Sequence, residues 1–124
     1  MATTKTHHEI ADGDTLTAAA GDTYWPSSSG TDLTGDFGAV LHAKVTNGAT
    51  GPTIPASLNL EVSEDATKWF GYGGTLVTGT GSNTVTQWGG VELPPATAYV
   101  RLRAGSNTGQ DVTLDASISG LSVA

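Results

Sequence analysis

The three histidines are the side chains of this chain best suited to acid–base chemistry or metal binding. His7 and His8 are adjacent in a polar N-terminal stretch, and His42 lies far from them in the sequence. Nucleophilic catalysis needs a histidine beside a serine or cysteine with a carboxylate behind it, and a metal site needs several ligands at a workable spacing. The chain has no cysteine, and it shows no G-x-S-x-G turn, phosphate-binding loop or H-E-x-x-H pattern. We therefore expect no enzyme, no metal and no cofactor.

Acidic side chains are the other groups that could act as acids, bases or calcium ligands. Asp12 and Asp14 flank Gly13, but the further oxygen ligands that a calcium loop needs at regular spacing are absent. We interpret Asp12-Gly13 as a turn. Glycoside hydrolysis would need two carboxylates across a cleft, and the candidates for such a pair are Glu61, Glu64, Asp65 and Glu92.

Aromatic side chains could bind a sugar ring by stacking, and four large ones lie in turn-rich or glycine-rich parts of the chain. These candidates for glycan binding are Trp25, Trp69, Tyr72 and Trp88. Trp25 precedes a proline and is expected to be extended, and we expect it to cap the core because large apolar groups are few. Glycan binding predicts instead that at least two of the four rings are exposed on one surface.

Charge and hydrophobicity exclude several classes of partner. The chain has 12 acidic and 5 basic residues and a net charge of −7, whereas phosphate binding normally uses a basic stripe. No apolar run approaches the roughly 20 residues needed to cross a bilayer. The polar N-terminus lacks the apolar core of a signal peptide, so export by that route is not expected. We expect no nucleic-acid partner and no membrane contact.

The amino-acid composition favours an all-β protein, so strands and turns must position these side chains. The 124 residues include 20 Thr, 10 Ser and 17 Gly, and no window repeats apolar residues at helical spacing. Strict alternation predicts strands over residues 37–46 and 57–63, and it turns His42 to solvent. After the second strand, Asp65 is placed to bond back to the backbone. The inward faces would carry Ala39, Leu41, Ala43, Val45, Leu58, Leu60 and Val62.

The C-terminal residues 98–118 show the clearest alternation in the chain. We predict a β-hairpin of two strands joined by the polar loop 105–111, with one buried face and one wet face. In that register Arg101 and Arg103 would lie opposite or diagonal to Asp111 and Asp115, so that charges on the wet face match. The buried face would carry Ala98, Val100, Leu102, Ala104, Val112, Leu114, Ala116 and Ile118.

Taken together, the segments predict a single all-β domain. Seven or eight short antiparallel strands at this spacing are typical of a β-sandwich or a jelly-roll-like domain. We place this sandwich in residues 21–124. Residues 1–20 are mostly polar and do not show a clear alternation of apolar and polar residues. We therefore expect an extended N-terminal arm or an edge strand there.

Several stretches resemble small structural proteins of tailed bacteriophages. They are residues 44–52 (KVTNGATGP), 60–65 (LEVSED) with Trp69 and 72–74 (YGG), 99–101 (YVR), and 104–112 (AGSNTGQDV). The likeness covers about residues 36 to 120. In such proteins the turn after the middle strand usually carries Asp-Gly, where this chain has Asp65-Ala66. The resemblance implies a β-sandwich protein of the virion.

The resemblance does not fix the place within the virion. The acidic charge, the small size, the polar N-terminal arm and the absence of catalytic motifs lead us to expect a capsid decoration or cement protein on the outer surface of the head. Its partners would be the major capsid protein and copies of itself, as a homotrimer. The N-terminal arm, from Thr3 to Leu16, would lie on or swap into a neighbouring chain and add backbone hydrogen bonds across the joint. The expected arm contacts are Thr3, Thr4, Lys5, Thr6, Ile10 and Leu16.

Two other functions stay open at this point. The protein could be a tail, head-fibre or spike component, or a carbohydrate-binding module outside any virion. Both would contact glycans through the four aromatic residues named above.

Overall fold

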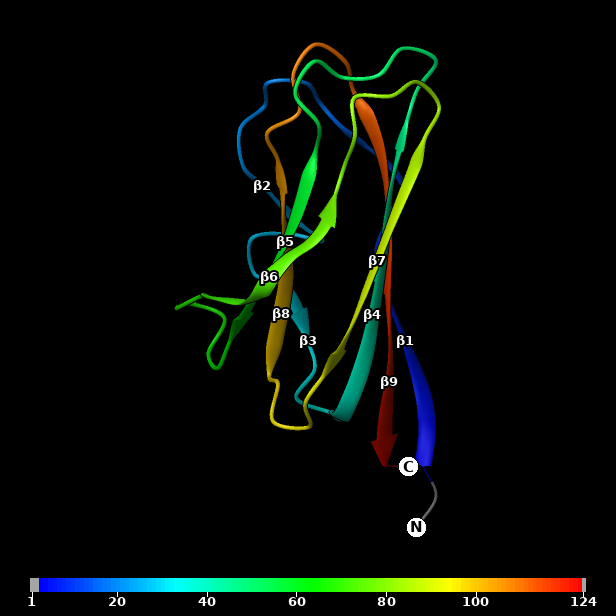
Figure 1. Ribbon diagram of the computed structural model, residues 1–124. Coiled ribbons are helices and arrows are strands. Elements are labelled where there is room, and N and C mark those ends of the chain that lie inside the picture. Colours follow the sequence, from blue (N-terminus) through cyan, green and yellow to red (C-terminus); the bar gives the residue numbers. More distant parts are fainter. Residues whose placement is uncertain (1–2, 124) are drawn as a thin grey trace.

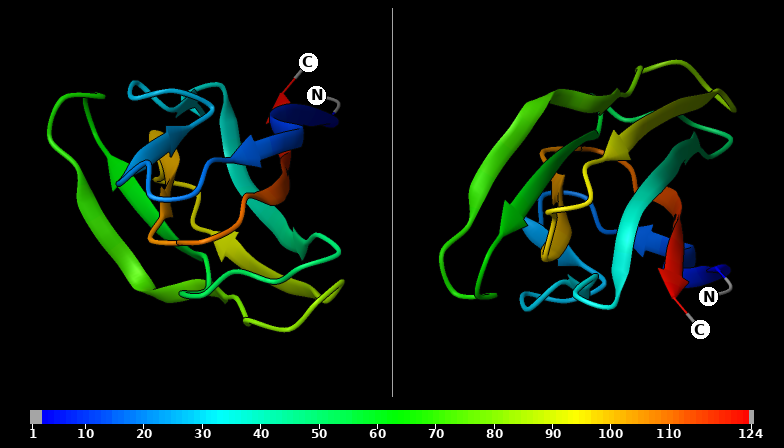
Figure 2. Two further views of the ribbon diagram at one scale, coloured as in Figure 1. Left: turned by 90° about the horizontal axis from the view of Figure 1, so that it is seen from above. Right: turned by 90° about the horizontal axis from the view of Figure 1, so that it is seen from below.

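Two antiparallel sheets face each other across a shared core in the computed structural model, which describes residues 3–123 (Figure 1). The end-on views show the sheets as separate layers (Figure 2). The strands of this range are β1 Thr3–Leu16, β2 Thr23–Trp25, β3 Thr31–Asp32, β4 Asp36–Asn47, β5 Ser57–Ser63, β6 Phe70–Thr78, β7 Thr86–Leu93, β8 Tyr99–Gly105 and β9 Val112–Val123. The predicted β-sandwich class is confirmed. Residues 1 and 2 of the expected arm and residue 124 of the expected sandwich lie outside the described residues.

The strand order is that of a jelly roll. The four-stranded sheet has the order β1-β9-β4-β7, and the five-stranded sheet has the order β2-β8-β5-β6 with β3 also paired to β8. Most consecutive strands therefore alternate between the two sheets, as in double-sheet jelly rolls. β1 and β7 are the edges of the four-stranded sheet, and β2 and β6 are the edges of the five-stranded sheet.

The core lies between the sheets and is built from the inward faces of alternating strands. Leu41, Leu58, Val100, Leu114 and Ile118 have no exposed surface. Such alternation places every second side chain on the core face. The inward faces predicted for residues 37–46, 57–63, 98–104 and 112–118 are those that the structure buries, although Ala39, Val62 and Ala98 are only partly covered.

The predicted C-terminal hairpin is wrong. β8 pairs with β5, β2 and β3, whereas β9 pairs with β1 and β4 in the opposite sheet. Residues 106–111 cross from one sheet to the other. Alternation determines which side chains face the core, and both strands face the same core, so the pattern is the same whether or not they pair with each other.

The N-terminal segment forms the edge strand β1 along β9 of its own chain, with irregular register between Glu9 and Asp14. The predicted turn at Asp12-Gly13 is wrong, because both residues lie within β1. Gly13 has φ +64, and the bulge around it bends the strand without reversing it. The irregular register allows the adjacent residues Ile10 and Ala11 both to be buried, and Leu16 is buried further along the strand.

Candidate functional site

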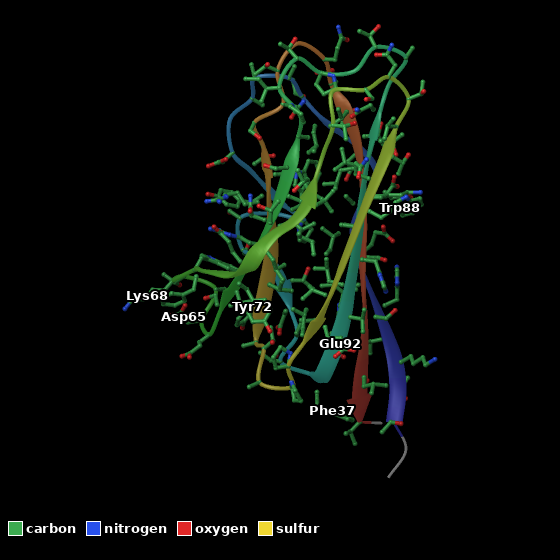
Figure 3. The ribbon with its side chains drawn as sticks, viewed as in Figure 1. Phe37, Asp65, Lys68, Tyr72, Trp88 and Glu92 are labelled. Carbon is green, nitrogen blue, oxygen red and sulfur yellow. The ribbon has the colours of Figure 1, made fainter. Side chains whose placement is uncertain are left out.

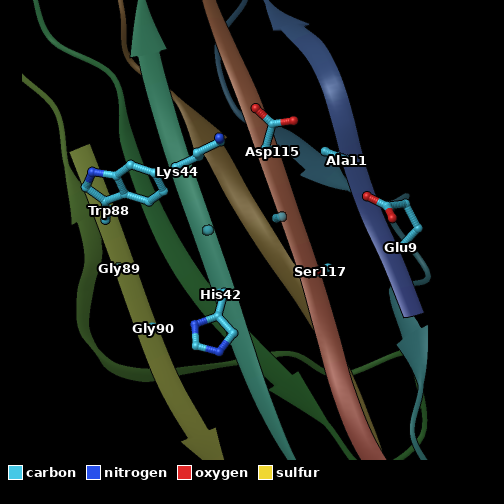
Figure 4. A pocket seen from close by; sticks show the side chains of 11 residues that line it. Glu9, Ala11, His42, Lys44, Trp88, Gly89, Gly90, Asp115 and Ser117 are labelled. Atoms are coloured by element: carbon cyan, nitrogen blue, oxygen red, sulfur yellow. The ribbon is translucent and has the colours of Figure 1, made fainter. Parts of the chain in front are cut away.

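The outer face of the four-stranded sheet carries a groove of about 490 Å³ (Figure 4). It runs across all four strands. The side chains and glycine that shape it, called here the Trp88 groove, are Glu9, His42, Lys44, Trp88, Gly90, Asp115 and Ser117.

Strand register brings these residues together. On one row, His42 of β4 lies between Ser117 of β9 and Gly90 of β7. On the next outward row, Lys44 of β4 lies between Asp115 and Trp88. Because alternate residues of a strand share a face, the two rows form one continuous surface.

Trp88 is the most exposed large apolar side chain among the described residues, with 71% of its surface accessible. It projects from the middle of β7, away from the core (Figure 3). The Lys44 Nζ lies 5.0 Å from the centroid of its ring, within the range of a cation–π contact. The ring is thus held in place on one side while most of its surface stays open.

The polar groups of the groove are only partly paired. Asp115 Oδ1 accepts a hydrogen bond from the Gly13 amide at 2.8 Å, and Glu9 Oε2 lies 3.0 Å from His7 Nε2. Within residues 3–123, no side-chain hydrogen bond or ion pair involves Lys44, His42 or Ser117. These three side chains are available to a ligand.

Gly90 keeps the floor of the groove open. A Cβ atom at this position would come within 3.1 Å of His42 Nδ1. A side chain at position 90 would therefore crowd the imidazole and occupy part of the groove. The glycine-rich stretch of β7 is what leaves room next to Trp88.

The outer face of the five-stranded sheet has a different kind of cluster, centred on Arg101. Its Cζ atom lies 3.9 Å from the centroid of the Tyr24 ring and 4.2 Å from that of Trp69. Its Nε donates to Glu61 Oε1 at 2.8 Å, and its Nη1 donates to the Ser28 carbonyl at 2.6 Å. We call these five residues the Arg101 cluster. The guanidinium is enclosed between two rings and satisfied by two acceptors.

The predicted ion pairs of Arg101 and Arg103 with Asp111 and Asp115 are wrong. Both arginines turn to Glu61 on β5, with Arg103 Nη1 3.7 Å from its Oε2. Asp111 and Asp115 accept backbone hydrogen bonds from the β1 side instead, at Ala18 and Gly13. The reason is the same as for the hairpin, since β8 and β9 lie in different sheets.

The turn after β5 confirms the expected role of Asp65. Its Oδ1 accepts hydrogen bonds from the amides of Thr67 and Lys68, both at 2.9 Å, and from the Ser63 hydroxyl at 3.1 Å. These bonds, led by the one from the Lys68 amide, hold the pKa of the Asp65 carboxyl below its ordinary value. The turn protrudes from the sandwich beside β6 (Figure 3).

The carboxylates considered for glycoside hydrolysis have different surroundings. Glu61 is committed to Arg101, and Asp65 to its own turn. Glu92 lies on β7, an edge of the opposite sheet. Within residues 3–123, no three His, Asp or Glu side chains are grouped so that they could hold a metal ion.

The arm residues divide into two groups. Thr3, Thr4 and Lys5 are exposed, whereas Ile10 and Leu16 are inside the core of their own chain. Within their own chain these two side chains help to close the sandwich, and they would contact another subunit only if β1 swapped into it.

A hydrogen-bonded cluster at β1 was missed by the sequence interpretation. The Asp36 carboxylate, 5% exposed, accepts from the Thr6 hydroxyl at 2.7 Å and lies 2.8 Å from His8 Nε2. Thr6, His8 and Ile10 are alternate residues of β1, and this spacing could have predicted that the three side chains share one face of the strand. The partner on β4 is 28 residues away from His8, and no local pattern predicts it.

The four aromatic candidates do not share a surface. Trp25 and Tyr72 are partly buried against the core, and Trp69 is in the Arg101 cluster. Only Trp88 is exposed. The expectation that at least two of these rings are exposed on one surface is therefore not met.

The start of β1 and the end of β9 lie side by side at one end of the molecule (Figure 1), and three exposed apolar residues missed by the sequence interpretation belong to the strand ends paired there. They are Phe37, Leu121 and Val123, called here the terminal patch. Asp36 pairs with Ser122, and Val123 pairs with Thr3, so the patch adjoins the start of β1. A hollow of about 460 Å³ lined by Lys5, Val40 and Leu121 continues from it.

No helix of the described residues is long and apolar enough to span a membrane. No protein-family model and no curated protein sequence matches this chain.

Several solved structures are similar in fold. The K3 cleaved adhesin domain of Lys-gingipain from Porphyromonas gingivalis W83 matches 78% of this chain and 63% of its own length, with TM-score 0.55 and 16% identity. The K1 cleaved adhesin domain of the same protein matches 94% of this chain and 97% of its own, with TM-score 0.51 and 15% identity. The structure of infectious bursal virus derived T=1 particles matches 98% of this chain, with TM-score 0.57 and 8% identity.

This chain spans less than two thirds of the K3 domain and 31% of the viral chain. At these identities the likeness shows a shared β-sandwich fold.

Proposed function

We propose that this protein is a structural component of a tailed-bacteriophage virion, a decoration or cement protein that stabilises the head by binding its outer surface as a homotrimer. The observation that carries the proposal is the terminal patch beside the open edge of β1. The sequence resemblance to phage structural proteins supports it, as does a jelly-roll fold similar to that of the infectious bursal virus particles. In this role the protein performs no catalysis and needs no cofactor.

The edge of β1 supplies the directional part of the contact. Among the described residues, this strand pairs only with β9, so no strand of the same chain occupies its other edge. An added strand from a neighbouring chain would pair there by backbone hydrogen bonds. Thr3, Thr4 and Lys5 are the side chains that would meet that strand.

The terminal patch supplies the apolar part of the contact. Phe37, Leu121 and Val123 are exposed large apolar residues at one end of the four-stranded sheet. Apolar groups at the centre of an interface contribute most of the binding energy, and polar groups surround them. Many identical contacts of this kind then sum by avidity over a symmetric shell. The major capsid protein and copies of this chain are the proposed partners.

The test compares capsid binding by matched variants. Phe37→Asp with Leu121→Asp places two charges in the terminal patch, and we expect binding to capsids that lack the protein to fall at least about tenfold. Ile54→Asp, at another exposed apolar residue, is the control and should bind as the parent does. Co-sedimentation with purified capsids measures the binding.

The edge strand is tested separately by removing residues 1–5. This truncation spares Ile10 and Leu16, which a longer deletion would take out of the core. We expect weaker capsid binding with an unchanged fold by circular dichroism. Undiminished binding by both the truncated and the double-aspartate protein would overturn the proposal.

A further inference from the structure

We propose that the Trp88 groove is a binding site for a neutral hexopyranose unit of a glycan. The site is separate from the terminal patch and does not rest on the proposed role in the capsid. It narrows the four aromatic candidates of the sequence to one, Trp88, and adds polar partners that the sequence did not indicate.

The shape of the groove fits one or two sugar rings. Its volume of about 490 Å³ lies within the roughly 300–1,000 Å³ of small-molecule sites. The floor is made of small residues, Gly90 and Ser117, and the indole of Trp88 forms a wall. A pyranose has an apolar face of C–H groups, which stacks on an open aromatic ring and covers surface that is otherwise in contact with water.

The polar groups around the indole match sugar hydroxyls, each of which both donates and accepts a hydrogen bond. Asp115 and Glu9 are acceptors, Lys44 is a donor, and the His42 ring and Ser117 hydroxyl can do both. Lys44, His42 and Ser117 have no side-chain partner within residues 3–123, and Asp115 uses one oxygen for the Gly13 amide. The groove therefore has free hydrogen-bonding capacity on several sides of the ring.

The charges of the groove select against two other ligands that stack on tryptophan. Two carboxylates, of Glu9 and Asp115, face one ammonium, of Lys44, and the chain has a net charge of −7. A nucleotide would bring a phosphate, and an acidic sugar a carboxylate, into a negative surface. A purely apolar ligand would leave the polar groups without partners. A neutral sugar avoids all three costs.

The experiment uses the full chain on an array of neutral oligosaccharides built from glucose, galactose or mannose units, with a hyaluronan oligosaccharide and single-stranded DNA as acidic probes. We expect retention on at least one neutral glycan and none on the acidic probes. Titration of that glycan, followed by amide NMR shifts, should show the largest changes at residues 42–44, 88–90 and 115–117.

Three variants test the assignment to the groove. Trp88→Ala removes the stacking ring, and Gly90→Thr fills the floor while keeping a residue that suits a strand. Each should lower the affinity at least about tenfold. Phe70→Ala removes another exposed aromatic side chain, on β6, and should leave the affinity unchanged.

Two results would overturn the inference. One is the absence of any neutral glycan that binds at millimolar concentration. The other is a bound glycan whose affinity is the same for the Trp88→Ala variant and the parent. Neither result bears on capsid binding, which is measured with variants of the terminal patch.

Discussion

The outer faces of the two sheets combine the same residue types with opposite outcomes. On the five-stranded sheet, Arg101 and Glu61 form an ion pair whose side chains are 12% and 14% exposed, closed over by Tyr24 and Trp69. On the four-stranded sheet, Lys44 lies beside a largely exposed Trp88 and has no carboxylate within ion-pair distance among the described residues.

The difference shows how a cation beside an aromatic ring can serve either stability or binding. In the Arg101 cluster the guanidinium donates to two acceptors and packs against two aromatic rings, so the group contributes to the fold. In the Trp88 groove several polar groups have no hydrogen-bond partner among the described residues. They contribute little to the stability of the fold and can contribute to the binding of a ligand. A cation beside an aromatic ring therefore predicts different responses to mutation on the two faces.

The largest expected effect is a loss of folding stability when the Arg101 cluster, on the outer face of the five-stranded sheet, is disrupted. Arg101→Ala should lower the free energy of unfolding by about 2–4 kcal/mol, because it leaves the enclosed Glu61 carboxylate without its main partner. Lys44→Ala is the matching variant on the outer face of the four-stranded sheet, and it should change the free energy of unfolding by less than about 1 kcal/mol. Urea unfolding followed by circular dichroism measures both. Equal losses would show that the two faces do not differ as described.

Replacing Trp69 or Trp88 should give a smaller and independent difference in stability between the two faces. Trp69→Ala should cost about 1–3 kcal/mol of unfolding free energy, since its ring covers Arg101 and is partly buried. Trp88→Ala should change stability by no more than about 0.5 kcal/mol, because the ring is exposed. Thermal unfolding of both variants checks this. A large loss for Trp88→Ala would mean that its ring has a structural role.

The turn that leads into Trp69 contains a residue whose replacement should stabilise the protein. Ala66 has φ +62, a conformation that costs an alanine about 1–2 kcal/mol and that glycine adopts freely. Ala66→Gly should raise the unfolding free energy by about 0.5–1 kcal/mol after the added entropy of the unfolded chain is subtracted. Ala96→Gly, in an exposed loop without a positive φ, is the control and should not stabilise. A loss of stability in Ala66→Gly would contradict this account of the turn.

The same turn should give a pH dependence of modest size. The pKa of Asp65 is lowered in the folded state, first by the Lys68 amide, so the ionised carboxylate favours folding above its ordinary value of 3.8. This contribution is lost as pH falls through the folded pKa. Carboxyl NMR should show Asp65 titrating below 3.8, and Asp65→Asn should flatten the loss of stability in that acid range. A titration midpoint at or above 3.8 would contradict it.

Most of the fold could be predicted from local pattern, and most of the candidate site could not. Alternation predicted the inward faces of β4, β5, β8 and β9, and the turn chemistry of Asp65 followed from its neighbours. The Trp88 groove escaped prediction because β7 is glycine-rich and shows no clear alternation. Its other members come from β1, β4 and β9, which are brought together only by strand pairing.

The sequence by itself therefore determined an all-β sandwich and which side chains its strong strands bury, because the period of two is a local property of an extended chain. The tertiary structure alone decided that β8 and β9 lie in opposite sheets, that Arg101 pairs with Glu61, and that Trp88 stands open beside Lys44. These contacts depend on which distant strand lies alongside, and an alternating strand accepts several partners with the same buried face.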